Sequence, residues 1–138
     1  MIQNRNMSRA ARKRTYTHIM DPVVADFQAG GFIDVENDIK ILRVDIVFLI
    51  ASGASEDAIV EIGTVADPNL YVSYTVADSQ AIGVVVNATL LVSTILAKNT
   101  PLIIQKDSAS ADTDATAKLA VTVTYVIVDD ANEGVTIP

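Results

Sequence analysis

Side chains that could carry out chemistry are few in this chain. The 138 residues include no Cys and no Trp, and His18 is the single histidine. Without cysteine there is no disulfide, no thiolate metal site and no thiol nucleophile. A Ser-His-Asp triad would have to use His18, which lies in a basic, polar stretch. The composition therefore argues against ordinary hydrolytic or redox chemistry, and we expect neither enzyme activity nor a cofactor.

Clusters of acidic residues are the remaining candidates for metal binding or acid–base chemistry. Asp34, Glu36 and Asp38 alternate as the oxygen ligands of a calcium loop do. They lack the glycine and the distant bidentate glutamate of a helix–loop–helix site, so a solvated turn is the better interpretation. The other acidic clusters are Asp112 with Asp114, and Asp129 and Asp130 with Glu133. We interpret the first as part of an exposed loop and the second as a solubilising end, and we expect no metal site.

Charge is distributed very unevenly along the sequence. Residues 1–20 contain no acid, whereas residues 21–138 contain all 17 acidic residues and the other five bases. The bases of the first segment are Arg5, Arg9, Arg12, Lys13 and Arg14. This asymmetry predicts a basic N-terminal arm over residues 1–20 and an acidic globular domain over residues 21–138. We expect the arm to become ordered only on a partner.

Three interpretations of the basic arm remain open from its residues alone. It could bind an acidic protein surface, with each cation adding a few tenths to about 1 kcal/mol of salt-dependent attraction. It could bind nucleic acid, although Tyr16 is the one aromatic residue among its bases, which argues against that partner. It could also be a terminus without function. Residues 1–14 lack the apolar stretch of an export signal, and the uncharged run 79–97 is too polar for a membrane span. We therefore expect synthesis in a cytoplasm and no membrane partner.

The domain has the pattern of an all-β protein. Residues 39–50 are the clearest strand, with Leu42, Val44, Ile46, Phe48 and Ile50 on one parity as the expected core face. An extended segment is expected over 22–27, and the loop 107–116 has no large apolar side chain. The other expected strands cover 32–35, 58–64, 70–76, 82–86, 90–96, 102–106 and 118–128. Some eight short strands separated by turns indicate an antiparallel sandwich or barrel.

Several of these strands are apolar on both faces. Ile59, Val60 and Ile62 form one such group, and residues 84–86 are three consecutive valines. A strand that is covered on both faces fits a subunit interface, the alternative being a thick monomeric core. We expect a homo-oligomer.

Parts of the domain resemble small structural proteins of tailed bacteriophages. The resemblance covers residues 38–128 and rests on the long strand 41–50, on Gly63-Thr64 followed by Asp67-Pro68, on Thr100-Pro101 before an apolar strand, and on the closing alternation 121–126. It implies a jelly-roll-like antiparallel β-sandwich that assembles as a trimer. It also implies a capsid cement or decoration protein on the outside of the virion, with the major capsid protein as partner.

In that interpretation the arm residues Arg5, Arg9, Arg12, Lys13 and Arg14 would contact the capsid and bridge its subunits. The resemblance does not extend to the arm, so their role comes from charge alone. The alternative is a receptor- or carbohydrate-binding sandwich of a phage fibre. Tyr71 and Tyr74 are the aromatic pair that could stack on a sugar there.

Overall fold

The computed structural model of the chain describes residues 13–21, 28–33, 36–54, 58–106 and 117–128. These residues form eight β-strands and no helical element. The strands are β1 (Arg14–Met20), β2 (Gln28–Ile33), β3 (Ile39–Ile50), β4 (Ile59–Gly63), β5 (Val72–Thr75), β6 (Val85–Ala88), β7 (Leu102–Lys106) and β8 (Lys118–Ile127). No described helix is long and apolar enough to cross a membrane.

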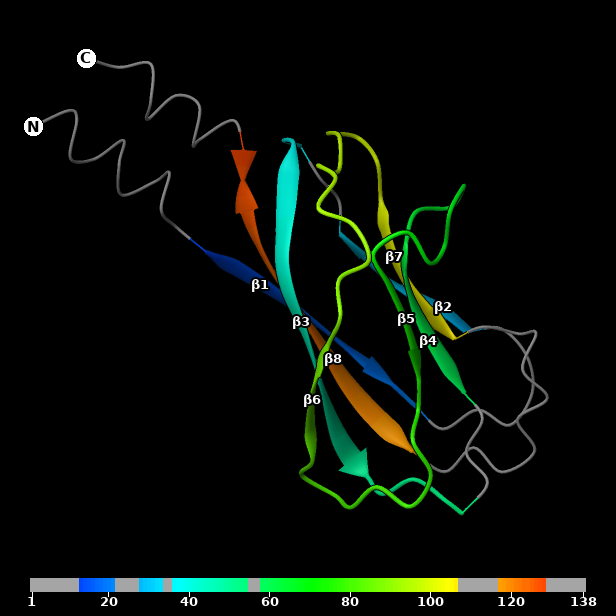
Figure 1. Ribbon diagram of the computed structural model, residues 1–138. Coiled ribbons are helices and arrows are strands. Elements are labelled where there is room, and N and C mark those ends of the chain that lie inside the picture. The colour runs from blue at the N-terminus through cyan, green and yellow to red at the C-terminus, as the bar shows by residue number, and fades with distance from the viewer. Residues whose placement is uncertain (1–12, 22–27, 34–35, 55–57, 107–116, 129–138) are drawn as a thin grey trace, which may run out of the picture.

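The strands form two antiparallel four-stranded sheets that face each other (Figure 1). Sheet I has the order β1-β8-β3-β6, and sheet II has the order β2-β7-β4-β5. The pairs β1–β8, β2–β7, β3–β6 and β4–β5 are those of a long hairpin folded at β4–β5 and wound around itself. This is the topology of a jelly roll. The prediction of an antiparallel, jelly-roll-like sandwich is confirmed.

The core lies between the two sheets and follows from the period-two alternation of their central strands. In β3, Val44, Ile46 and Phe48 are completely buried. In β8, Val121 and Val123 lie opposite Ile46 and Val44 and are also completely buried. Sheet II contributes the inward side chains of β4 and β7, which are Val60, Ile62, Leu102 and Ile104. Burial of large aliphatic side chains from both inner faces stabilises the sandwich, at about 1.5–3 kcal/mol for each.

The predicted core face of β3 is wrong at its two ends. The pairing of β3 with β8 shifts between Ile41 and Arg43, so Leu42 is an extra residue in a β-bulge. The bulge reverses which parity points inward, so Ile39 and Ile41 are buried while Leu42 is half-buried. A second shift between Phe48 and Ile50 leaves Ile50 exposed. The alternation of residues within β3 cannot predict this bulge, because the extra residue is defined only by the pairing of β3 with β8.

Part of the segment predicted as a basic arm is a strand of the sandwich. Residues Arg14–Met20 form β1 at the edge of sheet I and pair with β8 over their whole length. Thr17 and Thr122 share a hydrogen bond of 2.9 Å between their hydroxyl oxygens on the outer face. The prediction that this stretch orders only on a partner is therefore wrong for residues 14–20. Residues 1–12 lie outside the described part of the chain.

Other strand boundaries differ more modestly from the prediction. The strand expected over 82–86 is β6, which begins three residues later, and the one expected over 32–35 is β2, at Gln28–Ile33. The segment 90–96 contains no named strand, although Leu96 forms a bridge with Ile39. The predicted segment 22–27 and loop 107–116 lie outside the described residues.

Gly63 ends β4 where the chain folds back on itself. The turn that follows is closed by bonds from Thr64 N and Leu70 N to the carbonyl oxygen of Asp67, at 2.9 and 3.1 Å. The Thr64 hydroxyl accepts a third bond, from Asp67 N at 3.1 Å. The Gly-Thr and Asp-Pro steps noted in the sequence are thus the two sides of one compact turn. Gly63 lies so close to this turn that no side chain fits there.

Candidate functional site

Two of the five predicted arm residues are described by the structure. Lys13 and Arg14 are exposed at the start of β1, and Arg14 lies opposite Tyr125 of β8. Arg5, Arg9 and Arg12 lie outside the described residues. The bases of residues 1–14 therefore lead directly into an edge strand of the sandwich, and the two described ones are consecutive residues at its start.

The end of the sandwich at which β1 begins is closed by backbone contacts. Val128 N, just after β8, donates a 2.8 Å bond to the carbonyl oxygen of Asp38, just before β3. The N–H of Lys98 donates a 2.9 Å bond to the Asp38 side chain. Lys13 and Arg14 lie at the start of β1, which is held in the sheet by its pairing with β8. A rigid attachment point lowers the entropic cost of holding these cations against a partner.

The acidic cluster considered as a calcium loop has a structural role at Asp38. Both its carboxylate and its backbone carbonyl accept bonds from backbone N–H groups. Asp34 lies outside the described residues, and the described part of the chain holds no group of three metal-ligating side chains. Asp112, Asp114, Asp129, Asp130 and Glu133 are also outside it. The described geometry favours a capped turn at Asp38.

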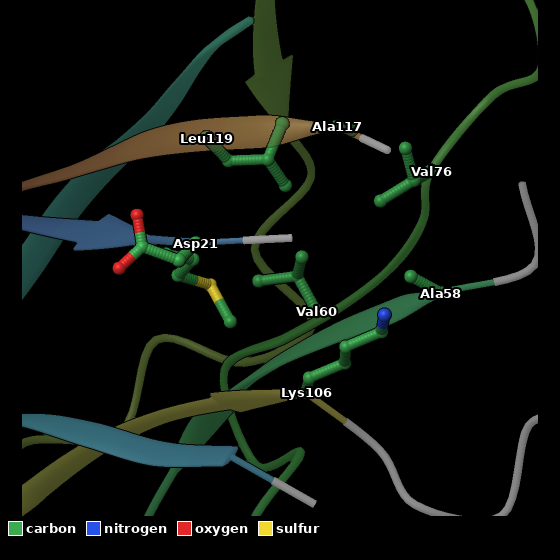
Figure 2. Close-up of a pocket in the computed structure, with 8 residues that line it drawn as sticks. Asp21, Ala58, Val60, Val76, Lys106, Ala117 and Leu119 are labelled. Atoms are coloured by element: carbon green, nitrogen blue, oxygen red, sulfur yellow. The ribbon is translucent and has the colours of Figure 1, made fainter. Parts of the chain in front are cut away.

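A small cavity lies at the opposite end of the sandwich, between the sheets (Figure 2). Its volume is about 10 Å³, which is room for about one water molecule. The lining is mostly aliphatic, with the side chain of Lys106 extending along one wall. Asp21 lies at its rim and pairs with Lys118 at 3.5 Å. A space of this size does not hold an organic substrate.

The aromatic pair of the carbohydrate-binding alternative is not an exposed platform. Tyr71 is 1% exposed, and its hydroxyl donates a 3.0 Å hydrogen bond to the carbonyl oxygen of Thr94. Burial raises the pKa of this phenol. Tyr74 is half-buried and packs against the core. Stacking on a sugar requires an exposed ring face, so Tyr71 cannot play that role.

His18 makes the stability of the fold sensitive to mild acid. It lies on the inward side of β1, opposite the buried Val121, and burial lowers its pKa below 6.5, with Asp21 opposing the shift. Between the two pKa values the unfolded chain binds more protons, so stability falls as the pH drops through 6.5. We expect a lower Tm at about pH 5.5 than at about pH 7.5, and a smaller decrease for His18→Gln.

Asp45 is not expected to contribute to the change in Tm between these two pH values. Bonds from Arg43 and Asn87 lower the pKa of Asp45 below 3.8. Its contribution is therefore present above that value and is lost only as the pH falls through the lowered pKa. An equal decrease in Tm between the two pH values for the wild type and His18→Gln would contradict the role of His18.

Residues 84–86 were expected to be apolar on both faces, but the exposed apolar side chains that β3 adds to the outer face of sheet I were not predicted. Val85 is 61% exposed there, and Val47 of β3 lies opposite it. The signal was present in the sequence, because residues 46–50 at the end of β3 are apolar at every position. Alternation assigns one face of such a run to the core and leaves the other face unexplained.

Comparison with solved structures shows where this fold recurs. The chain matches part of the cyanophage Pam1 capsid asymmetric unit at 18% sequence identity and a TM-score of 0.52, covering 84% of each chain. A weaker match is to the acidic stable capsid structure of Helicobacter pylori bacteriophage KHP30. It has 9% identity and a TM-score of 0.44, and covers 83% of this chain and 92% of that one. The Pam1 match shows a shared fold over most of both chains. No protein-family model and no curated protein match the sequence.

Proposed function

We propose that this chain is a structural protein of a phage virion. In this proposal it binds the outer surface of the head as an oligomer and stabilises the shell by bridging capsid subunits, as a cement or decoration protein. The observation that carries the proposal is the jelly-roll topology, shared over 84% of both chains with a component of the Pam1 capsid asymmetric unit. Its partners would be the major capsid protein and further copies of itself, as a trimer.

The role is one of binding, with no catalytic step and no cofactor. Support comes from the lack of Cys and the single His in the sequence. The acid at the turn before β3 is also engaged, since Asp38 accepts backbone hydrogen bonds. Among the described residues, several acidic and tyrosine side chains already bond to other residues of the same chain, as Asp45 and Tyr71 do.

The bases at the start of the chain would make the contact to the capsid. Lys13 and Arg14 are exposed at an edge of sheet I, and Arg5, Arg9 and Arg12 precede them in a stretch without acids. Each exposed ion pair with an acidic surface contributes about 0.2–1 kcal/mol. Several copies of such a weak attachment on one oligomer give strong overall binding, because after the first contact the others become intramolecular.

The test compares matched pairs of charge-removing variants in binding to phage heads. Heads are assembled without this chain from the major capsid protein encoded in the same genome, and co-sedimentation is measured at low and moderate salt. We expect Lys13→Gln with Arg14→Gln to weaken binding about tenfold, and removal of residues 1–12 to weaken it further. The matched control is Lys40→Gln with Lys98→Gln, which removes the same charge from two exposed bases at the same end of the sandwich but outside β1.

The truncation stops at residue 12 because residues 14–20 are a strand of sheet I. If the truncated chain and the Lys13/Arg14 variant both bound heads as well as the wild type does, these bases would not be what attaches the chain to the head. An equal loss in the Lys40/Lys98 control would show that binding does not depend on the bases at the start of β1 in particular. No sedimentation of the wild-type chain with heads would overturn the proposed function itself.

A further inference from the structure

An apolar row crosses the whole outer face of sheet I. In the strand register, Ile19 of β1 lies opposite Ala120 of β8, Ala120 opposite Val47 of β3, and Val47 opposite Val85 of β6. Side chains at paired positions point to the same side of a sheet, so these four form one continuous row. Ile19 and Val85 are exposed, while Val47 and Ala120 are half-buried by their neighbours.

The row widens into a patch at the end of β3. The N–H of Gly83 donates a 2.8 Å bond to the carbonyl oxygen of Phe48, which places Ile82 beside the last residues of β3. Leu49, Ile50 and Ile82 are exposed, Ile82 by 68%. We call the patch formed by Ile19, Val47, Leu49, Ile50, Ile82 and Val85 the apolar band. A contiguous apolar surface rimmed by polar groups is typical of a protein interface.

The rim of the apolar band is polar and its charges are paired within the chain. On one side, Arg43 donates two bonds of 2.9 Å to the carboxylate of Asp45, and Asn87 donates one of 3.1 Å to the same carboxylate. On the other side, Lys118 pairs with Asp21 at 3.5 Å. These residues present two bases and two acids, so the rim carries little net charge.

This neutrality identifies the occupant that fits the apolar band. The chain as a whole carries a net charge of −7, so most contacts between two copies would bring like charges together. The rim of the apolar band avoids that repulsion because its charges are paired within the chain. The apolar side chains of the band would also leave water on association, which is favourable. A strongly basic partner would gain no attraction from these paired charges.

We infer that the outer face of sheet I is the surface through which this chain contacts further copies of itself. The contact buries the apolar band of each copy and leaves the basic residues at the start of β1 accessible to another partner. The inference deepens the oligomer named in the proposed function, on which it rests for its biological meaning. Its test uses the purified chain alone, so it can fail or succeed independently of capsid binding.

The experiment measures the mass of the purified chain by light scattering over a range of concentrations. We expect the wild type to be an oligomer, and Val85→Glu and Ile82→Glu each to raise the dissociation constant by at least about tenfold, since a carboxylate would be buried in an apolar contact. Val65→Glu is the matched control. Val65 is 71% exposed and lies in the turn that follows β4. Because β4 belongs to sheet II, this turn is not part of the apolar band.

The outcomes separate the inference from its rivals. If the wild type were a monomer at about 100 µM, the inference would be overturned. Protein–protein interfaces of standard size have dissociation constants below that concentration. An oligomer that resists both band variants, or that Val65→Glu disrupts equally, would assign the contact to another face. Ile82 lies outside any strand, so Ile82→Glu remains decisive if Val85→Glu fails to fold. An intact oligomer that does not bind heads would overturn the proposed function and leave this inference standing.

Discussion

Replacing Gly63 with alanine is expected to destabilise the fold by about 3 kcal/mol. A Cβ atom at this position would overlap the carbonyl oxygen of Asp67 and would lie 2.7 Å from Leu70 N and from the carbonyl carbon of Pro68. All three are backbone atoms of the turn that follows β4, so none can move aside by a change of rotamer. The turn would have to open, with loss of the hydrogen bonds from Thr64 and Leu70 to Asp67.

Gly83→Ala is the matched control for this substitution. Gly83 has a φ of +85°, but apart from Gly83 itself and its two chain neighbours no residue has an atom within 4 Å of an added Cβ. The cost there comes from the left-handed backbone alone and is expected to be about 1 kcal/mol. Urea unfolding measures both free energies. Equal costs for the two variants would show that the close approach at Gly63 does not set its requirement for glycine.

Tyr71→Ala is expected to cost about 3–5 kcal/mol, because the ring is among the largest fully buried side chains. The residue also joins three parts of the fold. Tyr71 N donates to Ile62 of β4, its carbonyl oxygen accepts from Leu91, and its hydroxyl donates to Thr94. The side chain therefore holds the segment around residue 94 onto the core. Removing it leaves a cavity and releases that segment.

Tyr71→Phe separates the contribution of the hydroxyl from that of the ring. It retains the apolar packing and loses one hydrogen bond to the carbonyl oxygen of Thr94, so we expect a cost of about 1 kcal/mol. The measurement is again urea unfolding of both variants. If Tyr71→Phe cost as much as Tyr71→Ala, the hydroxyl rather than the buried ring would be the important feature. Either result fits the burial of Tyr71, which removes it from the carbohydrate-binding alternative.

The strands at the centre of each sheet and the edge strand β5 could be predicted from the sequence, whereas the edge strand β1 could not. β3, β4, β7 and β8 alternate or run apolar because at least one of their faces packs in the core. β1 was missed because Arg14 and the bases before it indicate a solvated segment, although Thr15-Tyr16-Thr17 has strong β-propensity. Its position is set by pairing with β8, a long-range effect that local composition does not report.

The candidate site shows the same limit. Charge counting found the basic residues but could not place their boundary with the sandwich, which lies at Arg14. The expected alternation of β3 passed over the fact that residues 46–50 are apolar at every position, so it did not show which of these side chains stay exposed. Only the register, which puts Ile19, Val47 and Val85 in one row, turns those separate residues into a surface.

The position of β8 between β1 and β3 has a consequence for synthesis on the ribosome. Arg14 lies opposite Tyr125, and Ile39 opposite Ile127, so neither β1 nor β3 acquires its main neighbour until β8 has been made. Pairing between segments so distant along the chain is slow, and a nascent chain lacking β8 would present unpaired strand edges. Sheet I must therefore assemble after translation of β8, and premature termination before residue 118 would yield an aggregation-prone fragment rather than a smaller folded domain.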